Sequence, residues 1–159
     1  MGTEQGKCHF KNGKAKATAI AGFLRSHGDN LPESSIKNAI SPTNLEHWHV
    51  VCDDKGKIAS GTYWEKSDWY LCTIKNLATR PDQRRKGFVA AVADKARIEA
   101  KDSGCLVLAA DITYDNVASQ KVFEKVGFKR INTFCWDKGQ KPADILHYVI
   151  LPPTGDTCI

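Results

Sequence analysis

The sequence predicts an α/β fold, because a strand, a basic turn, a helix and a second strand follow one another along the chain. Residues 71–79 are mostly β-branched or apolar and contain no Gly or Pro, which indicates a strand, and Pro81 then ends it for lack of an N–H. Apolar side chains recur every three or four residues over 88–100, as on one face of a helix. After Gly104, the apolar run 105–110 predicts a second, buried strand. We expect these two strands to pair in parallel through a right-handed crossover.

The remaining elements follow from the same kinds of pattern. A helix is expected over 117–126, ended by Gly127, and Phe128 begins the next strand. Residues 130–136 and 145–151 are expected to be antiparallel strands joined by a loop at 138–142. The first third of the chain predicts an opening strand at 7–10, helices at 14–27 and 33–40, and a hairpin of strands 47–53 and 57–66 around the turn 54–56.

The turn between the strand and the helix predicts an anion site. Arg84, Arg85 and Lys86 precede Gly87, and the helix begins directly afterwards. The first N–H groups of a helix lack intrahelical partners, and the helix dipole adds about half a positive charge there. Glycine leaves room for a phosphate beside the backbone. The alternative is an ordinary solvated turn.

Length and composition are typical of one compact domain. The 159 residues are expected to form a single domain over 1–159. The sequence contains no run of eighteen apolar residues, so no membrane span is expected. Six cysteines form no Cys-x-x-Cys pair, and four lie in predicted strands (Cys52, Cys72, Cys105, Cys135), so we expect them to act as small hydrophobic residues in a reducing cytoplasm. His47 and His49 could form a metal pair, but a third ligand is not evident, and no metal is predicted.

Two motifs in this framework resemble those of the GNAT superfamily, the N-acetyltransferases that use acetyl-CoA. The first motif covers Thr79-Arg80-Pro81 and Arg84-Arg85-Lys86-Gly87-Phe88-Val89, and the second covers Asn116, Ala118, Phe123 and Gly127-Phe128. The resemblance implies a mixed sheet of six to seven strands, four flanking helices and a splayed strand pair that holds acetyl-CoA, with the cofactor-binding core at about 69–130. Two positions depart from the family pattern. Val89 replaces a glycine, and Phe123 replaces the tyrosine that protonates the departing CoA thiolate in many members.

The same resemblance implies the donor-binding residues. The backbone of Leu77, Ala78 and Thr79 is expected to pair with the pantetheine arm, and Asn116 to hydrogen-bond it or to cap its helix. Phe123 is expected to pack against the arm, and Ser119 to hold a water that substitutes for the missing tyrosine hydroxyl. The diphosphate is expected on the loop and first helical turn, at Arg84, Arg85, Lys86, Gly87, Phe88, Val89 and Ala90.

Acyl transfer needs a neutral amine, and a lysine-like amine is almost wholly protonated near pH 7. Thr73 stands where one GNAT pattern has a catalytic glutamate, whereas Asp111 stands where ribosomal-protein and N-terminal acetyltransferases have a carboxylate. Burial at the end of a strand would raise the pKa of Asp111 and suit it as a base; the alternative is a cap or a salt bridge. Tyr114 and Ser119 are the hydroxyls expected near the leaving thiolate. By resemblance, candidates to line the amine groove are Trp48, Tyr63, Trp64, Trp69 and Trp136, each of which could equally fill the core.

The net charge of +5 is concentrated in residues 75–101, which hold eight basic and three acidic residues. CoA, which carries several negative charges, accounts for this excess; nucleic acid is a competing but disfavoured partner. The family resemblance therefore implies a cytoplasmic N-acetyltransferase, monomeric or homodimeric, that acts on a primary amine of a small molecule or protein. The alternatives are an acyl-CoA-binding sensor or degenerate member, and, more remotely, a nucleic-acid-binding module.

Overall fold

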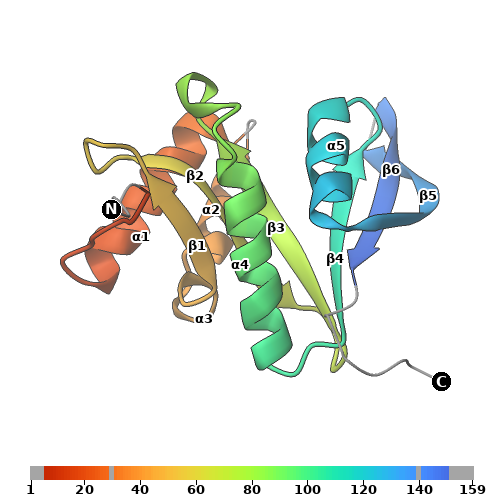
Figure 1. Ribbon diagram of the computed structural model, residues 1–159, viewed down its shortest axis with the longest axis horizontal. Coiled ribbons are helices and arrows are strands. Elements are labelled where there is room, and N and C mark those ends of the chain that lie inside the picture. The colour runs from red at the N-terminus through yellow and green to blue at the C-terminus, as the bar shows by residue number, and fades with distance from the viewer. Residues whose placement is uncertain (1–5, 29–30, 139–140, 151–159) are drawn as a thin grey trace.

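One mixed β-sheet organises the chain (Figure 1). The computed structural model describes residues 6–28, 31–138 and 141–150, and only the backbone of 134–138, 141–148 and 150. Within these residues six strands are ordered β1-β2-β3-β4-β6-β5, and only β3 and β4 run in parallel. This confirms the predicted mixed sheet and the parallel pair joined by a helix. The helices are α1 (Gly13–His27), α2 (Glu33–Ala39), α3 (Pro42–Leu45), α4 (Phe88–Asp102) and α5 (Val117–Val126), and the strands are β1 (Trp48–Cys52), β2 (Ile58–Lys66), β3 (Leu71–Thr79), β4 (Val107–Thr113), β5 (Lys129–Lys138) and β6 (Lys141–Ile150).

Two main hydrophobic clusters attach the helices to the sheet. In the first, alanines of α4 and Phe123 of α5 pack on apolar side chains of β2, β3 and β4. Small residues in α4 allow its backbone to lie close to the strands. In the second, Ile20 and Leu24 of α1 and Ile36 of α2 pack with Trp48 and Tyr63. Within the part of the chain that the structure describes, no helix is both long and apolar enough to cross a membrane.

Three predicted elements differ from those observed. Residues 7–10 form no strand, although the Gly6 carbonyl accepts a hydrogen bond from the Cys52 N–H at the edge of β1. The strand expected at 105–110 instead spans 107–113, because β6 pairs with it as far as Thr113. The loop expected at 138–142 is shorter, because Lys138 pairs with Lys141 and extends the hairpin.

The prediction that the cysteines remain unpaired is wrong for four of the six. Cys8 forms a disulfide with Cys52, 44 residues away, and Cys72 forms one with Cys105, 33 residues away. Three of these four side chains are also buried in the core, so the small-hydrophobe part of the prediction is confirmed for them. The disulfides remove the argument that the cysteines indicated a reducing compartment. Cys158 and the side chain of Cys135 lie outside the described residues.

Candidate functional site

The two parallel strands separate partway along their length. β3 and β4 pair only from Leu71 to Thr73, opposite Val107 to Ala109. Beyond that point the rest of β3 pairs only with β2, while β4 continues to pair with β6 up to Thr113. The edges of 74–79 and 110–113 that face each other are therefore not paired together. Their backbone N–H and C=O groups can bind a ligand between the strands, since strand edges carry unpaired groups of this kind. Helix α4 lies over β1, β2 and β3 on one side of this opening, and α5 lies beside β4 on the other (Figure 1).

A β-bulge interrupts β3 where it borders the opening. The register with β2 shifts between Gly61 and Tyr63, so that Asn76 and Leu77 lie opposite Thr62 alone. Asn76 has a φ of 50°, in the left-handed region that asparagine tolerates better than most residues. A bulge leaves the extra residue outside the ladder and redirects the strand, and bulges are over-represented beside active sites.

The loop after β3 has the form of an anion-binding turn. Arg85 and Gly87 both have positive φ, 65° and 77°, and Gly87 is the N-cap of α4. Such alternation of backbone hand lets successive N–H groups converge on one point. The first N–H groups of α4 have no partners within the helix, and the side chains of Arg84, Arg85 and Lys86 are exposed. Nothing lies within 4 Å of the position of a Cβ on Gly87, so the space beside this turn is open.

Arg80 fixes the beginning of this loop. Its N–H donates to the Ala59 carbonyl, and its guanidinium forms ion pairs of 2.8 Å with Asp53 and with Asp82. The Lys57 backbone N–H and the Arg80 guanidinium, both hydrogen-bonded to Asp53, hold the pKa of that carboxyl below its usual range. Arg80 is therefore occupied in anchoring the loop to the β1–β2 turn.

Helix α5 begins at the other side of the opening. The Asn116 side chain accepts a hydrogen bond from the Ser119 N–H at 3.2 Å, so the predicted capping role is confirmed, and asparagine rather than Asp115 performs it. Tyr114 is 66% exposed, and Ser119 is half-buried in the first turn of the helix. These residues follow β4 directly, so the chain brings them to the same end of the sheet as the bulge in β3.

Asp111 lies on β4 beside the opening, in register with His147 of β6. Its side chain is exposed, so the burial that was expected at the end of this strand is absent. Thr73 is buried, and its hydroxyl lies 2.8 Å from that of Ser67. The position that carries glutamate in one GNAT pattern is thus held by a satisfied hydroxyl at the point where the strands separate.

The sequence profile described as "Acetyltransferase (GNAT) family" matches residues 17–128. The chain belongs to this family. GNAT proteins are acyltransferases, and the separated β3–β4 pair and the basic loop lie within the matched region. No curated protein sequence matches the chain significantly.

Solved structures of GNAT proteins share the fold. An acetyltransferase (GNAT family) from Bacillus anthracis has a TM-score of 0.67 and 19% identity, over 92% of each chain. The ribosomal-protein-S18-alanine N-acetyltransferase from Escherichia coli has a TM-score of 0.71 and 16% identity, over 90% of this chain and 92% of that one. yncA, a putative acetyltransferase from Salmonella typhimurium with its cofactor acetyl-CoA, has a TM-score of 0.71 and 14% identity, over 94% and 97%.

Phe123, which replaces the tyrosine of many GNAT proteins, is 3% exposed and packs edge-to-face on Phe128 with ring centroids 5.0 Å apart. It belongs to the core between α4, α5 and the sheet. Contact with a pantetheine arm stays a prediction for this side chain. Its burial means that a hydroxyl added to the ring would need a partner in or beside that core.

The aromatic residues expected along the amine groove lie in different places. Trp48, Tyr63 and Trp64 are buried in the core, and Trp48 donates its indole N–H to the Ala39 carbonyl at 2.8 Å. Trp69 is 71% exposed in the β2–β3 turn, and the side chain of Trp136 lies outside the described residues. The first three therefore have the core-filling role that the sequence analysis left open.

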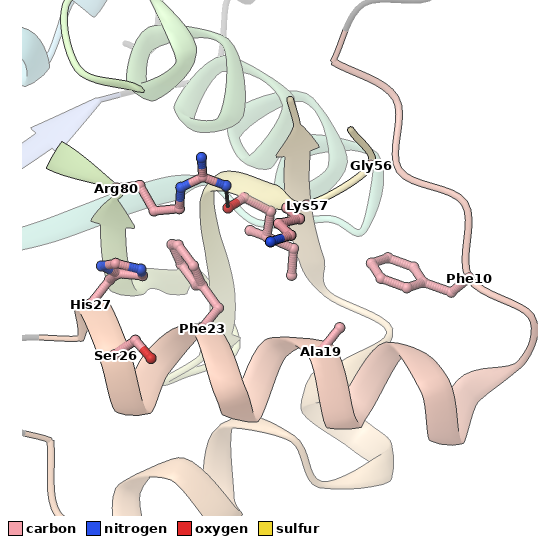
Figure 2. A pocket seen from close by; sticks show the side chains of 9 residues that line it. Phe10, Ala19, Phe23, Ser26, His27, Gly56, Lys57 and Arg80 are labelled. Atoms are coloured by element: carbon pink, nitrogen blue, oxygen red, sulfur yellow. Dashed lines mark hydrogen bonds between the residues drawn. The ribbon is translucent and has the colours of Figure 1, made fainter. Parts of the chain in front are cut away.

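An open hollow lies on the α1 side of this GNAT protein (Figure 2). It is lined by Phe10, Ala19, Phe23, Ser26, His27, Gly56, Lys57, Ile58 and Arg80. Arg80 is shared between this hollow and the loop before α4, but among the described residues none from β4 or α5 lines it. The hollow is therefore separate from the opening between the strands. Within the described residues no group of three His, Cys, Asp or Glu side chains could hold a metal; His47 instead stacks on Trp64, and His49 contacts Glu99.

Proposed function

We propose that this GNAT protein transfers the acetyl group of acetyl-CoA to a primary amine, by direct attack while donor and acceptor are bound together. The observation that carries the proposal is the parting of β3 and β4 beside a bulge, on the same strand that runs into the basic turn. A donor with a peptide-like arm and a diphosphate matches both features at once. The Salmonella typhimurium protein yncA, which shares this fold and was solved with its cofactor acetyl-CoA, supports this choice of donor.

The residues of this chain suit such a donor. The freed edge of β3 at Leu77, Ala78 and Thr79 can pair with amide groups of the pantetheine arm, as a neighbouring strand would. The N–H groups of 85–90 can bind the diphosphate, with Gly87 leaving space and the basic side chains adding charge. The chemistry supplied by the bound donor is that of a thioester, which an amine can attack directly.

The acceptor side offers a carboxylate and two hydroxyls. Asp111 is exposed beside the opening, where it can hold the incoming ammonium and take a proton from it directly or through water. Tyr114 and Ser119, at the start of α5, are the groups that we assign to the leaving thiolate. A backbone N–H of the bulged segment of β3 can stabilise negative charge on the acyl oxygen.

The test is a screen of amines with acetyl-CoA, in which the released thiol is measured. Polyamines, aminoglycosides, amino acids and peptides are each tried with the wild-type protein and with Asp111→Asn. We expect thiol release that depends on one class of amine, and a lowered rate with an altered pH profile for Asp111→Asn. An unchanged rate and pH profile in that variant would remove Asp111 from the proposal.

A second candidate function is donor binding without turnover. The buried, satisfied Thr73 and the phenylalanine at position 123 favour it, since two polar groups used by other GNAT proteins are missing. Tight binding of acetyl-CoA, with no thiol released in the presence of any amine, would support this function and contradict the first.

A further inference from the structure

Two fully buried hydroxyls lie on β2, the strand that pairs with β3 at its bulge. Ser60 and Thr62 both have 0% exposure, and the hydroxyl of each bonds to a backbone carbonyl of β3. The Thr62 hydroxyl donates to the Lys75 carbonyl at 2.8 Å. The Ser60 hydroxyl donates to the Ala78 carbonyl at 3.1 Å and lies 2.8 Å from the Thr79 hydroxyl. The two bonds therefore flank the bulged residues, one on each side.

These bonds give partners to two backbone carbonyls on either side of the bulge. At a bulge the ladder is locally broken, and buried backbone carbonyls that lose their ladder partners must find others. Thr62 lies opposite two residues of β3 instead of one, so its neighbourhood is where that loss occurs. A buried hydroxyl also needs a partner of its own, so donor and acceptor satisfy each other.

The hydrogen bonds from Thr62 and Ser60 together form a clamp on β3. This clamp also determines which groups of β3 stay available to the opening. Because Lys75 and Ala78 are tied to β2, the segment between them cannot slide into a regular register with Tyr63 and Gly61. The left-handed conformation at Asn76 is then held in place, although most residues other than glycine avoid it. The N–H groups of Asn76 and Leu77 are thus positioned by side chains that touch neither donor nor acceptor.

We propose that Thr62, assisted by Ser60, is a positioning residue for acyl transfer: its hydroxyl sets the bulge whose N–H groups meet the acyl oxygen. This inference rests on the proposed acetyltransferase activity. It assigns a role in rate to a residue of a neighbouring strand, and it separates donor binding, which the basic turn provides, from placement of the acetyl group.

The decisive variant is Thr62→Val, which has nearly the same shape and lacks the hydroxyl. Thr62→Ser restores the hydroxyl. Asn44→Leu is the matched control, because Asn44 is also a buried side chain (6% exposed) that donates to a backbone carbonyl, that of Asn38 at 2.9 Å, but it lies in α3. For each variant we would measure the melting temperature, the affinity for CoA without its acetyl group, and kcat with the best amine.

We expect Thr62→Val to lower kcat at least tenfold, while its affinity for CoA stays within about threefold of wild type. Thr62→Ser should recover most of kcat, and Asn44→Leu should lose a similar amount of melting temperature with kcat retained. Wild-type kcat in Thr62→Val, or an equal loss of kcat in Asn44→Leu, would overturn the inference. So would a failure of Thr62→Ser to restore the rate.

A second readout keeps failure of this inference distinct from failure of the proposed function. In ¹⁵N-labelled protein, the amide signals of Asn76 and Leu77 should shift when acetyl-CoA is added to wild type and to Thr62→Ser, and less in Thr62→Val. Such shifts without turnover of any amine would overturn only the transferase activity and leave the clamp supported. Shifts of equal size in Thr62→Val, or none in wild type, would overturn the clamp.

Discussion

Replacing Gly87 by alanine separates the role of the basic turn in folding from its role in binding. Gly87 has a φ of 77°, and the left-handed region costs an L-residue about 1–2 kcal/mol. No atom lies within 4 Å of the added methyl group, so packing adds no further cost. For a chain of this size, about 1 kcal/mol corresponds to about 2–4 °C in melting temperature, so Gly87→Ala should melt about 2–8 °C lower.

Gly56 provides a matched control within the same chain. It has the same φ of 77° and equally open surroundings, but it lies in the β1–β2 turn. Gly56→Ala should therefore lose the same melting temperature as Gly87→Ala. Only Gly87→Ala places a methyl group against the bound diphosphate, so its affinity for acetyl-CoA should fall about tenfold or more, equivalent to about 1.4 kcal/mol.

The assay is isothermal titration with acetyl-CoA, combined with thermal unfolding monitored by circular dichroism. Affinity in Gly56→Ala should stay within about twofold of wild type. If Gly87→Ala bound acetyl-CoA as wild type does, with the expected loss of melting temperature, the diphosphate would not lie on this turn. Equal loss of affinity in both variants would show a general effect of destabilisation and would likewise count against a diphosphate site on this turn.

Three further predictions concern single side chains. Phe123→Tyr should still fold and bind acetyl-CoA, and its turnover should equal or exceed that of wild type. If the added hydroxyl finds no partner, the folded protein should lose about 1–3 kcal/mol of stability. Loss of acetyl-CoA binding in this variant would count against the proposed site. Asp53→Asn should lower the melting temperature at pH 7, because the depressed pKa of Asp53 contributes stability above about pH 4. In thermal unfolding scans, the difference in melting temperature between wild type and this variant should shrink as the pH falls below that value. A difference that stays constant with pH would contradict this role. Burial lowers the pKa of His49 in the folded protein, an effect that Lys95 and Lys16 reinforce and nearby Glu99 opposes. The folded protein should therefore lose stability as the pH drops below about 6.5, and His49→Gln should lose less. Identical pH profiles of stability for the two proteins would argue against this assignment.

The elements with strong local signals were predictable from the sequence. Strand 71–79 and helix 117–126 have the predicted bounds, because Pro81 ends the first, while Asn116 caps the second and Gly127, with a φ of 112°, ends it. The family motifs located the basic turn for the same reason, since its charges and its glycine are adjacent in the chain. Local chemistry was sufficient in these places.

Features that depend on pairing between distant segments could not be predicted. Cysteine spacing does not determine which thiols meet, so the Cys8–Cys52 and Cys72–Cys105 bonds were missed. The burial of Trp48 and the clamp of Thr62 on Lys75 likewise depend on sheet register. The bulge did leave one signal.

That signal is Asn76, which lies inside the strand 71–79. Asparagine is depleted in strands and enriched where φ is positive, so its presence there could have indicated an irregularity. The exposure of Asp111 had no comparable signal. Exposure at this position depends on what covers β4. The apolar residues before Asp111 are buried, but that burial does not extend to Asp111 itself.

A crystal structure of this protein grown with acetyl-CoA would locate the donor directly. We expect the proposed arrangement, with the diphosphate on the N–H groups of 85–90, the pantetheine arm between β3 and β4, and the acetyl group beside Asn76 and Leu77. Acetyl-CoA bound in the hollow between α1 and the β1–β2 turn, or anywhere else away from the basic turn, would contradict it.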